Sequence, residues 1–148
     1  MPLFLVPNPE EGNGGGGFNG GRLVLEVQGR PDPLPTLFHE CLHALLLQHK
    51  TAIESAAKSA GLSWGAMNEG IAYALAPGLI DTVEESDSLA EALVRNVLRG
   101  TPASDAYVQA YSVAVVIRPL LREALESGET ITTFLPKAAT KWRNAAGR

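Results

Sequence analysis

The clearest alternation of apolar and polar positions lies in residues 22–29, RLVLEVQG. Leu23, Leu25 and Val27 fall on one side of an extended chain, which is the period of two expected for a half-buried strand. A shorter apolar run, residues 3–6, is closed by the sequence PNP and is expected to form another strand. These two segments predict a small sheet near the N-terminal end of the sequence.

The rest of the chain repeats its apolar residues at helical spacing, and glycine or proline separates the repeats. The expected helix stops are Gly61, Gly100 and Gly128, and Pro119 is expected to kink or break the longest helix. The expected helices span Pro35 or Thr36 to about Lys50, residues 51–60, residues 63–75, Ser86 or Ser88 to Gly100, residues 105–127 and about Thr132 to Asn144. These patterns predict one domain over residues 1–148, with an α+β fold that is mainly α.

Residues 12–21 hold seven glycines in ten positions. Such a segment satisfies a GxGxxG pattern trivially, but no GK[ST] sequence follows and no strong strand leads directly into a helix. We therefore expect a flexible, glycine-rich surface loop at residues 12–21 rather than a phosphate-binding loop.

Charge and cysteine content exclude several classes of protein. The 12 basic and 16 acidic residues give a formal net charge of -4, without a cluster of Lys or Arg that would follow a nucleic-acid backbone. No apolar run approaches the length needed to cross a bilayer, and the first residues lack the features of a secretion signal. A single cysteine, Cys41, rules out an internal disulfide framework. We expect a cytoplasmic protein with no nucleic-acid or membrane partner.

Two histidines and a glutamate lie in the first expected helix, in the sequence FHECLHALLLQH. Residues four apart on a helix differ by about 40° in direction, so His39 and His43 can reach the same ion. Glu40 lies about 100° from His39, where it can take a proton from a water beside the metal. Because apolar residues cover almost the whole circumference, we expect this helix to be central, where an unpaired polar group is costly.

A third protein ligand must be a carboxylate or Cys41, because His49 lies on a different side of the helix. Cys41 is about 200° from each histidine and is expected to be a core residue. The candidate acids are Glu54, Glu69, Asp81 and the acids beyond residue 84. Glu69 differs from the others because it sits in a mostly apolar helix. With His39 and His43 it would leave a fourth metal position open, as a catalytic zinc requires.

The segments HECLH and GAMNEGIA together resemble the gluzincin zinc metallopeptidases, and GAMNE is similar to the glutamate helix of thermolysin-type enzymes. The resemblance implies a zincin-like fold with Zn²⁺ held by His39, His43 and Glu69. It also implies peptide hydrolysis with Glu40 as the general base, on a peptide or protein substrate.

Two further positions decide how close that resemblance is. Asn68 matches the asparagine that precedes the liganding glutamate in thermolysin-type enzymes. Tyr73 stands where those enzymes carry an acid that orients a histidine ligand, and the interval from His43 to Glu69 is longer than theirs. We interpret the chain as a minimal, divergent gluzincin.

The resemblance also implies a tyrosine that donates to the developing oxyanion from a region after the glutamate helix. Tyr111 is the first candidate and Tyr107 the second, since they lie four apart on the expected helix over residues 105–127. Tyrosines on a packed helix are more commonly core residues with one hydrated hydroxyl group.

The strand at residues 22–29 directly precedes the HExxH helix. We expect it to be an edge strand packed on that helix, where an extended peptide can add as a further strand. The alternative function is a zinc-binding regulatory or peptide-recognition domain that keeps the ligands without turnover. Retention of Glu40, which binds no metal, favours the peptidase.

Overall fold

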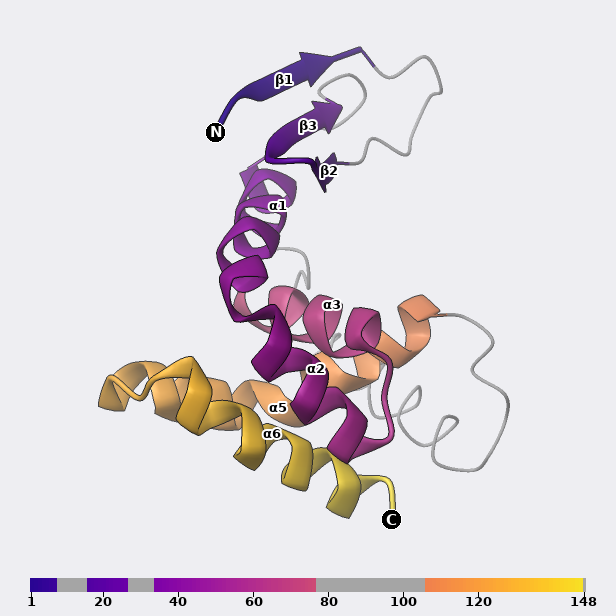
Figure 1. Cartoon of the computed structure of the whole chain (residues 1–148), viewed down its shortest axis with the longest axis vertical. Helices are drawn as coiled ribbons and strands as arrows, with labels where there is room; N and C mark the ends of the chain where they lie inside the picture. The colour runs from indigo at the N-terminus through magenta and orange to yellow at the C-terminus, as the bar shows by residue number, and fades with distance from the viewer. Residues whose placement is uncertain (8–15, 27–33, 77–105, 148) are drawn as a thin grey trace.

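The computed structural model describes residues 1–7, 16–26, 34–76 and 106–147, and over these ranges the chain is α+β and mainly α. The sheet lies at one end of the molecule, α1 leads away from it, and the other helices pack together at the far end (Figure 1). The helix expected between Ser86 or Ser88 and Gly100 lies outside the described residues.

The sheet has three strands, β1 (Leu3–Val6), β2 (Gly16–Asn19) and β3 (Arg22–Glu26), in the order β1-β3-β2. β1 pairs with β3 in parallel and β2 pairs with it antiparallel. Leu23 and Leu25 are 4% and 3% exposed, so the predicted alternation is confirmed at these positions. The prediction that this strand lies at the edge is wrong, because β3 is central and β1 and β2 form the two edges.

β2 and the turn after it lie within residues 12–21, where a flexible loop was expected. Asn19 pairs with Arg22, which leaves Gly20 and Gly21 as a two-residue turn with φ angles of 56° and 77°. A turn with positive φ at both central residues matches the twist of a hairpin, and glycine adopts it without steric cost. The loop prediction is therefore wrong at these positions: the glycine run encodes a hairpin there.

The HExxH helix is shorter than expected. α1 (Leu34–Leu46) is followed by the 3₁₀ turn η1 (Leu47–His49) and then by α2 (Lys50–Ala60). Gly61 ends α2 with a φ of 69°, and its N–H donates to the carbonyls of Ala57 and Lys58, as its role as a helix stop predicts.

α1 is not a central helix, although its sequence is apolar nearly all round. The sheet and α3 cover the side that carries His39 and Glu40, which are 6% and 8% exposed. Phe38 and Leu45, on another side, are 55% and 60% exposed. The prediction that this helix is central is wrong, because the described neighbours of α1 cover only part of its circumference.

The remaining helices are α3 (Trp64–Leu75), α5 (Ala106–Ser127) and α6 (Ile131–Ala145). Ser63 caps α3 by accepting the Ala66 N–H at 3.1 Å, which is the usual role of serine at that position. The sequence analysis expected Pro119 to kink or break the longest helix. α5 continues through Pro119, so this proline does not break it.

α3 is the element that connects the core to the site. It packs against α1, α2 and α5, while α6 closes the core against α2 and α5. Met67 and Ile71, on its buried side, are 0% and 1% exposed and join Ile53, Ile117 and Phe134 in the core. This packing holds Asn68 and Glu69, which follow Met67 in α3, against the side of α1 that carries His39 and His43.

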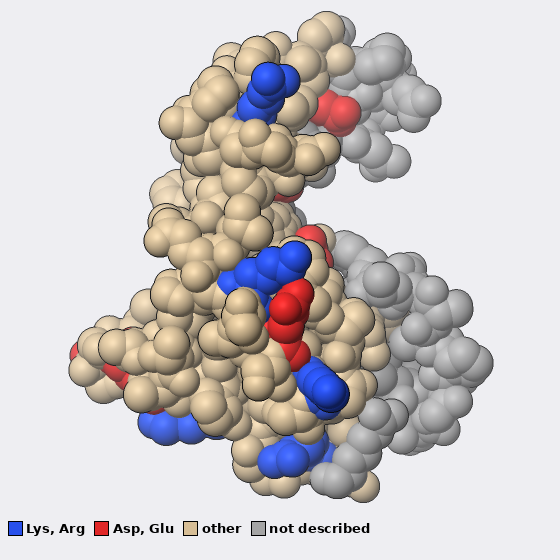
Figure 2. Space-filling view, in the orientation of Figure 1, with Lys and Arg blue, Asp and Glu red and all other residues tan. Residues whose placement is uncertain are grey.

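Among the described residues, no helix is both long and apolar enough to cross a membrane. On the face shown in Figure 2, Lys and Arg side chains are spread over the molecule and interleaved with acids. The same view shows the surface hollowed between the sheet end and the helical end, which is where the candidate site lies.

Candidate metal centre

Three metal-ligating side chains converge between α1 and α3. His39 Nε2 lies 2.9 Å from His43 Nε2 and 3.1 Å from Glu69 Oε2. His43 Nε2 lies 3.2 Å from Glu69 Oε1. Of the described residues, these three form the set of histidine, cysteine and acid side chains able to hold one ion. The structure therefore brings together the three residues that the sequence predicted as metal ligands.

The spacing of these atoms fits a small divalent ion. A tetrahedral zinc with bonds of roughly 2.0 to 2.1 Å separates its ligand atoms by about 3.3 Å. The separations of 2.9, 3.1 and 3.2 Å are within a few tenths of that value. Two imidazole nitrogens and one carboxylate oxygen are also a usual donor set for zinc with an open fourth position. The residues therefore fit the metal.

The charges of the cluster are coupled. Burial acts to raise the pKa of Glu69, but hydrogen bonds from His39 and His43 outweigh it and hold that pKa at about 2. Burial also acts to lower the pKa of His43, yet its hydrogen bond to Glu69 and the negative charges of Glu69 and Glu40 raise it overall. Glu69 is thus ionised, and His43 stays protonated to a higher pH than an ordinary histidine.

Asn68 lies behind His43 and sets its orientation. Its Nδ2 donates to His43 Nδ1 at 2.8 Å, while its Oδ1 is buried without a hydrogen-bond partner among the described residues. Rotating the amide by 180° exchanges these two atoms, after which Oδ1 accepts a proton from Nδ1. That arrangement leaves the Nε2 lone pair free for a metal, as a liganding histidine requires.

His39 has a different outer neighbour. Its Nδ1 is buried, with no hydrogen-bond partner in the described part of the chain. The centroid of its ring lies 4.6 Å from that of Tyr73. The rings are tilted at 44°, so Tyr73 packs against the imidazole and limits its rotation. Besides the contacts of its Nε2 with Glu69 and His43, His39 is held by packing against Tyr73, whereas Nδ1 of His43 has a hydrogen bond to Asn68.

Glu40 points into the same site without joining the ligand cluster. It is 8% exposed and lines the cavity together with His43 and Glu69. Burial raises its pKa above the ordinary 4.5, although His43, His39 and a hydrogen bond from the Phe18 backbone N–H act in the opposite direction. A carboxylate with a raised pKa, next to a metal position, has the properties of a general base.

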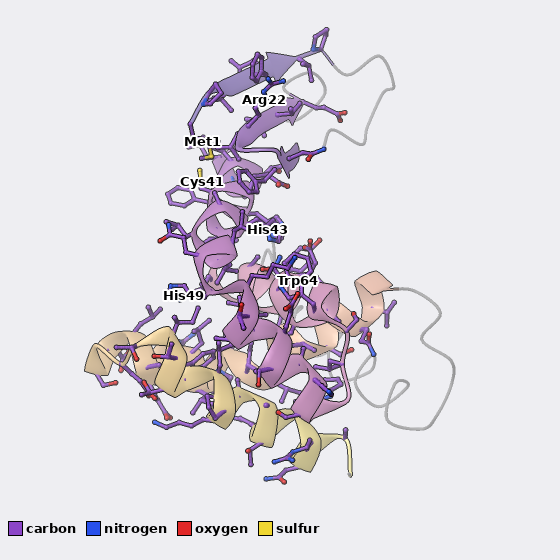
Figure 3. The ribbon with its side chains drawn as sticks, in the orientation of Figure 1. Met1, Arg22, Cys41, His43, His49 and Trp64 are labelled. Carbon is purple, nitrogen blue, oxygen red and sulfur yellow. The ribbon has the colours of Figure 1, made fainter. Side chains whose placement is uncertain are left out.

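The cavity itself is about 450 Å³ and lies between β2, α1 and α3. β2 and the following glycine form one wall, and Leu47 and Trp64 line another part. His43 and Trp64 are on the hollowed side of the molecule in Figure 3, whereas Cys41 and His49 are on the opposite side of the chain. Cys41 is half-buried rather than a core residue.

Neither tyrosine candidate lines this cavity among the described residues. Tyr111 is 8% exposed and its ring lies 5.6 Å from that of Tyr73, so one ring separates it from His39. Tyr107 belongs to α5, but its side chain lies outside the described residues. A donor role for either tyrosine stays a prediction.

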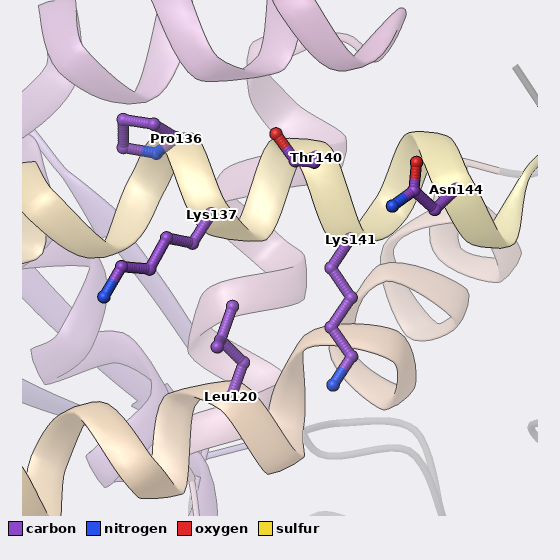
Figure 4. A pocket seen from close by; sticks show the side chains of 6 residues that line it. All are labelled: Leu120, Pro136, Lys137, Thr140, Lys141 and Asn144. Atoms are coloured by element: carbon purple, nitrogen blue, oxygen red, sulfur yellow. The ribbon is translucent and has the colours of Figure 1, made fainter.

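A second cavity, of about 530 Å³, lies between α5 and α6 (Figure 4). It is lined by Leu120, Pro136, Lys137, Thr140, Lys141 and Asn144. This set contains no imidazole, thiol or carboxylate, so it offers a metal no usual ligand. Lys137 also pairs with Glu129 at 2.7 Å.

Sequence reasoning missed the contribution of β2 to this site. Gly16 and Phe18 both approach Glu40, and Gly16, Gly17 and Gly20 line the cavity. The signal that identifies β2 is the Gly-Gly pair between FN and the alternating strand RLVLE, which is typical of a two-residue hairpin.

Comparison with protein-family models, with curated proteins and with solved structures found no match to this chain. The function therefore has to be inferred from the geometry of the site.

Proposed function

We propose that this chain is a zinc-dependent peptidase of the gluzincin type, with a zincin-like fold. One observation carries the proposal: Nε2 of His39, Nε2 of His43 and the Glu69 carboxylate converge within 4.8 Å, and Glu40 lines the same cavity. A purely structural zinc site is usually closed by four protein ligands and has no use for an additional buried carboxylate. An open three-ligand set with a neighbouring base favours catalysis.

The cofactor that fits is Zn²⁺. When bound, it would lower the pKa of a water molecule and polarise the substrate carbonyl. His39, His43 and Glu69 would hold it, and Asn68 would keep the ring of His43 turned toward it.

Glu40 is the proposed general base. It takes a proton from the attacking water as the water oxygen bonds to the carbonyl carbon of the scissile peptide. When the C–N bond breaks, Glu40 returns that proton to the leaving nitrogen, so that one water is consumed for each bond cleaved. Its raised pKa supports this role, because a base works best when its pKa approaches the pH at which it acts.

The proposed substrate is a peptide in extended conformation. β2 is an edge strand that lines the cavity, so the outward backbone groups that Glu40 does not use can form hydrogen bonds with a peptide. This contact would align the peptide bond with Glu40. β2 thus takes the peptide-binding role that the sequence analysis had expected of the strand at residues 22–29.

The test compares the wild-type chain with Glu40→Gln in metal content and in cleavage of a mixed peptide library. We expect about one zinc per chain in both, because Glu40 is outside the ligand set. The variant should lose roughly 10²- to 10⁴-fold in kcat/KM, the usual contribution of a general base. Glu126→Gln, which changes an exposed acid of α5, is the matched control and should cleave like the wild type.

Two results would overturn the proposal. Retained cleavage in Glu40→Gln would remove the general base from the mechanism. A wild-type chain that binds zinc but cleaves no library peptide would support the zinc-binding regulatory or recognition domain instead.

A further inference from the structure

Gly16 approaches Glu40 more closely than any other residue type permits. A Cβ at Gly16 would lie 2.8 Å from Cγ of Glu40, 2.9 Å from Cγ2 of Thr36 and 3.3 Å from Oε1 of Glu40. Real Cβ atoms essentially never show contacts under 3.0 Å, so a side chain here would force Glu40 and Thr36, or β2 itself, to shift. The absence of a side chain is what brings the backbone of β2 onto the proposed base.

The same strand bonds to the carboxylate. The backbone N–H of Phe18 donates a hydrogen bond to Glu40. In an antiparallel pair, successive residues turn their backbone groups alternately toward and away from the partner strand. Because the Phe18 N–H bonds to Glu40 of α1, it is on the outer side of β2 and points away from β3.

Gly17 shows that the close approach belongs to one position of the strand. It lies beside Gly16 in β2 and lines the same cavity, but a Cβ added there meets no atom within 4 Å. The glycines of the strand thus differ in what they contribute. Gly17 occupies open space, whereas Gly16 is in contact with Glu40 and Thr36.

Glu40 needs such a contact to act as a base. A glutamate side chain has several rotatable bonds, and fixing it in one conformation costs conformational entropy. The ionised Glu69 in the same cavity also acts on Glu40 as a like charge. A donor on the β2 side keeps the Glu40 carboxylate at one place in the cavity despite this repulsion.

We propose that Gly16 and the Phe18 amide are positioning residues for Glu40, so that β2 orients the general base in addition to receiving the substrate. This inference rests on the proposed function for its kinetic consequence, but the contact itself exists without turnover. Displacement of β2 from α1 should therefore change the rate of the chemical step more than metal or substrate binding.

The kinetic test compares Gly16→Ala and Gly17→Ala in the full chain loaded with zinc. Gly16→Ala should lower kcat by about 10-fold or more, since a misplacement of about 1 Å can cost 10²-fold in rate. Its KM and zinc affinity should stay within about twofold of the wild type, the pattern for an interaction that matters only in the transition state. Gly17→Ala keeps the Phe18–Glu40 bond, so its kcat should exceed that of Gly16→Ala at least about fivefold. Equal losses in both variants would overturn the inference.

A second measurement does not depend on activity or on the folding of Gly16→Ala. The amide proton of Phe18 is followed by NMR in the wild-type chain, in Glu40→Gln and in Gly17→Ala. A hydrogen bond to a carboxylate shifts an amide proton downfield and slows its exchange. We expect both effects in the wild type and Gly17→Ala, and their reduction in Glu40→Gln.

The two proposals fail separately in these experiments. A Phe18 resonance that is the same in the wild type and Glu40→Gln would overturn the positioning role, whatever the activity. A Phe18 resonance that responds as expected, in a chain that cleaves no peptide, would overturn the peptidase and leave the contact between β2 and Glu40 established.

Discussion

Asn68 and His43 meet across the contact between α3 and α1, with Nδ2 of the amide 2.8 Å from Nδ1 of the imidazole. This pair decides which nitrogen of His43 carries the proton. With Nδ2 as donor, the proton is on Nε2, where it faces Glu69. With Oδ1 as acceptor, the proton moves to Nδ1 and Nε2 becomes a metal ligand.

Asn68→Leu should weaken zinc binding by about 10- to 100-fold, the usual effect of losing the hydrogen-bond partner of a liganding histidine. Asn68→Asp keeps an oxygen acceptor for Nδ1 and should stay within about tenfold of the wild type. Competition titration with a chelator measures both affinities. Equal weakening in the two variants would show that Asn68 contributes packing rather than an acceptor.

The three proposed ligands should be distinguishable from the remaining histidine. His39→Ala and Glu69→Ala should each weaken zinc binding by more than about 100-fold, which exceeds the effect of losing an outer partner. His49→Ala is the control, because His49 is outside the ligand cluster and lies on the opposite side of the chain (Figure 3). Zinc content after dialysis gives the comparison, and a loss of zinc from His49→Ala would contradict this ligand set.

The metal-free chain should be most stabilised by the contact between His43 and Glu69 in mildly acidic solution. The pKa of Glu69 is depressed from 4.5 to about 2, so its contribution is complete above pH 4.5 and is lost as the pH falls through about 2. The pKa of His43 is raised above 6.5, so its contribution is complete below pH 6.5 and is lost as the pH rises through the raised value. The contact therefore stabilises the metal-free chain most between pH 4.5 and 6.5.

Thermal unfolding of chelator-treated wild type and Glu69→Gln across this pH range tests the prediction. The difference in Tm should be largest inside the window and should shrink toward pH 8. Zinc should reverse the trend above pH 6.5, because it binds neutral imidazole and its affinity rises as His43 loses its proton. A Tm difference that grows with pH in the metal-free protein would contradict the coupling.

Gly70 should be needed for the packing of α3 on α5. A Cβ there would lie 2.5 Å from Cγ1 of Val113, 2.7 Å from its Cβ and 3.1 Å from the carbonyl oxygen of Ala110. Gly70→Ala should lower the free energy of unfolding by about 1 to 3 kcal/mol, the usual cost of overpacking. Urea unfolding measures this change.

Gly65→Ala is the matched control on the same helix, since the nearest atom to its added Cβ is Ser63 Oγ at 3.9 Å. It should change the free energy of unfolding by less than about 1 kcal/mol, and alanine's higher helix propensity favours stabilisation. A loss in Gly65→Ala as large as that in Gly70→Ala would mean that the contact with Val113 does not decide the effect.

Local signals predicted the elements well where one residue type controls the backbone. Gly61 ends α2 and Gly128 follows the end of α5, both with a φ of 69°. The alternation in β3 identified Leu23 and Leu25 as buried, since successive residues of a strand face opposite sides. The spacing of His39 and His43 predicted that their Nε2 atoms meet, because one helical turn separates them.

Tertiary structure decided what depends on partners distant in the sequence. The apolar circumference of α1 indicated burial, but which side is covered depends on where the sheet and α3 pack. The central place of β3 follows from its pairing with strands on both sides, and an alternating pattern contains no information on strand order. The glycine run indicated freedom of the backbone, and pairing with β3 turned part of it into β2.

The candidate site divides in the same way. The sequence by itself determined the chemistry on offer, two imidazoles one turn apart with a glutamate beside them, because those relationships lie within one helix. Only the tertiary structure brought Glu69 and Asn68 onto the histidines and the Phe18 amide onto Glu40. Those contacts depend on the packing of α3 and β2 against α1, and packing is set by the shapes of surfaces that no short stretch of sequence contains.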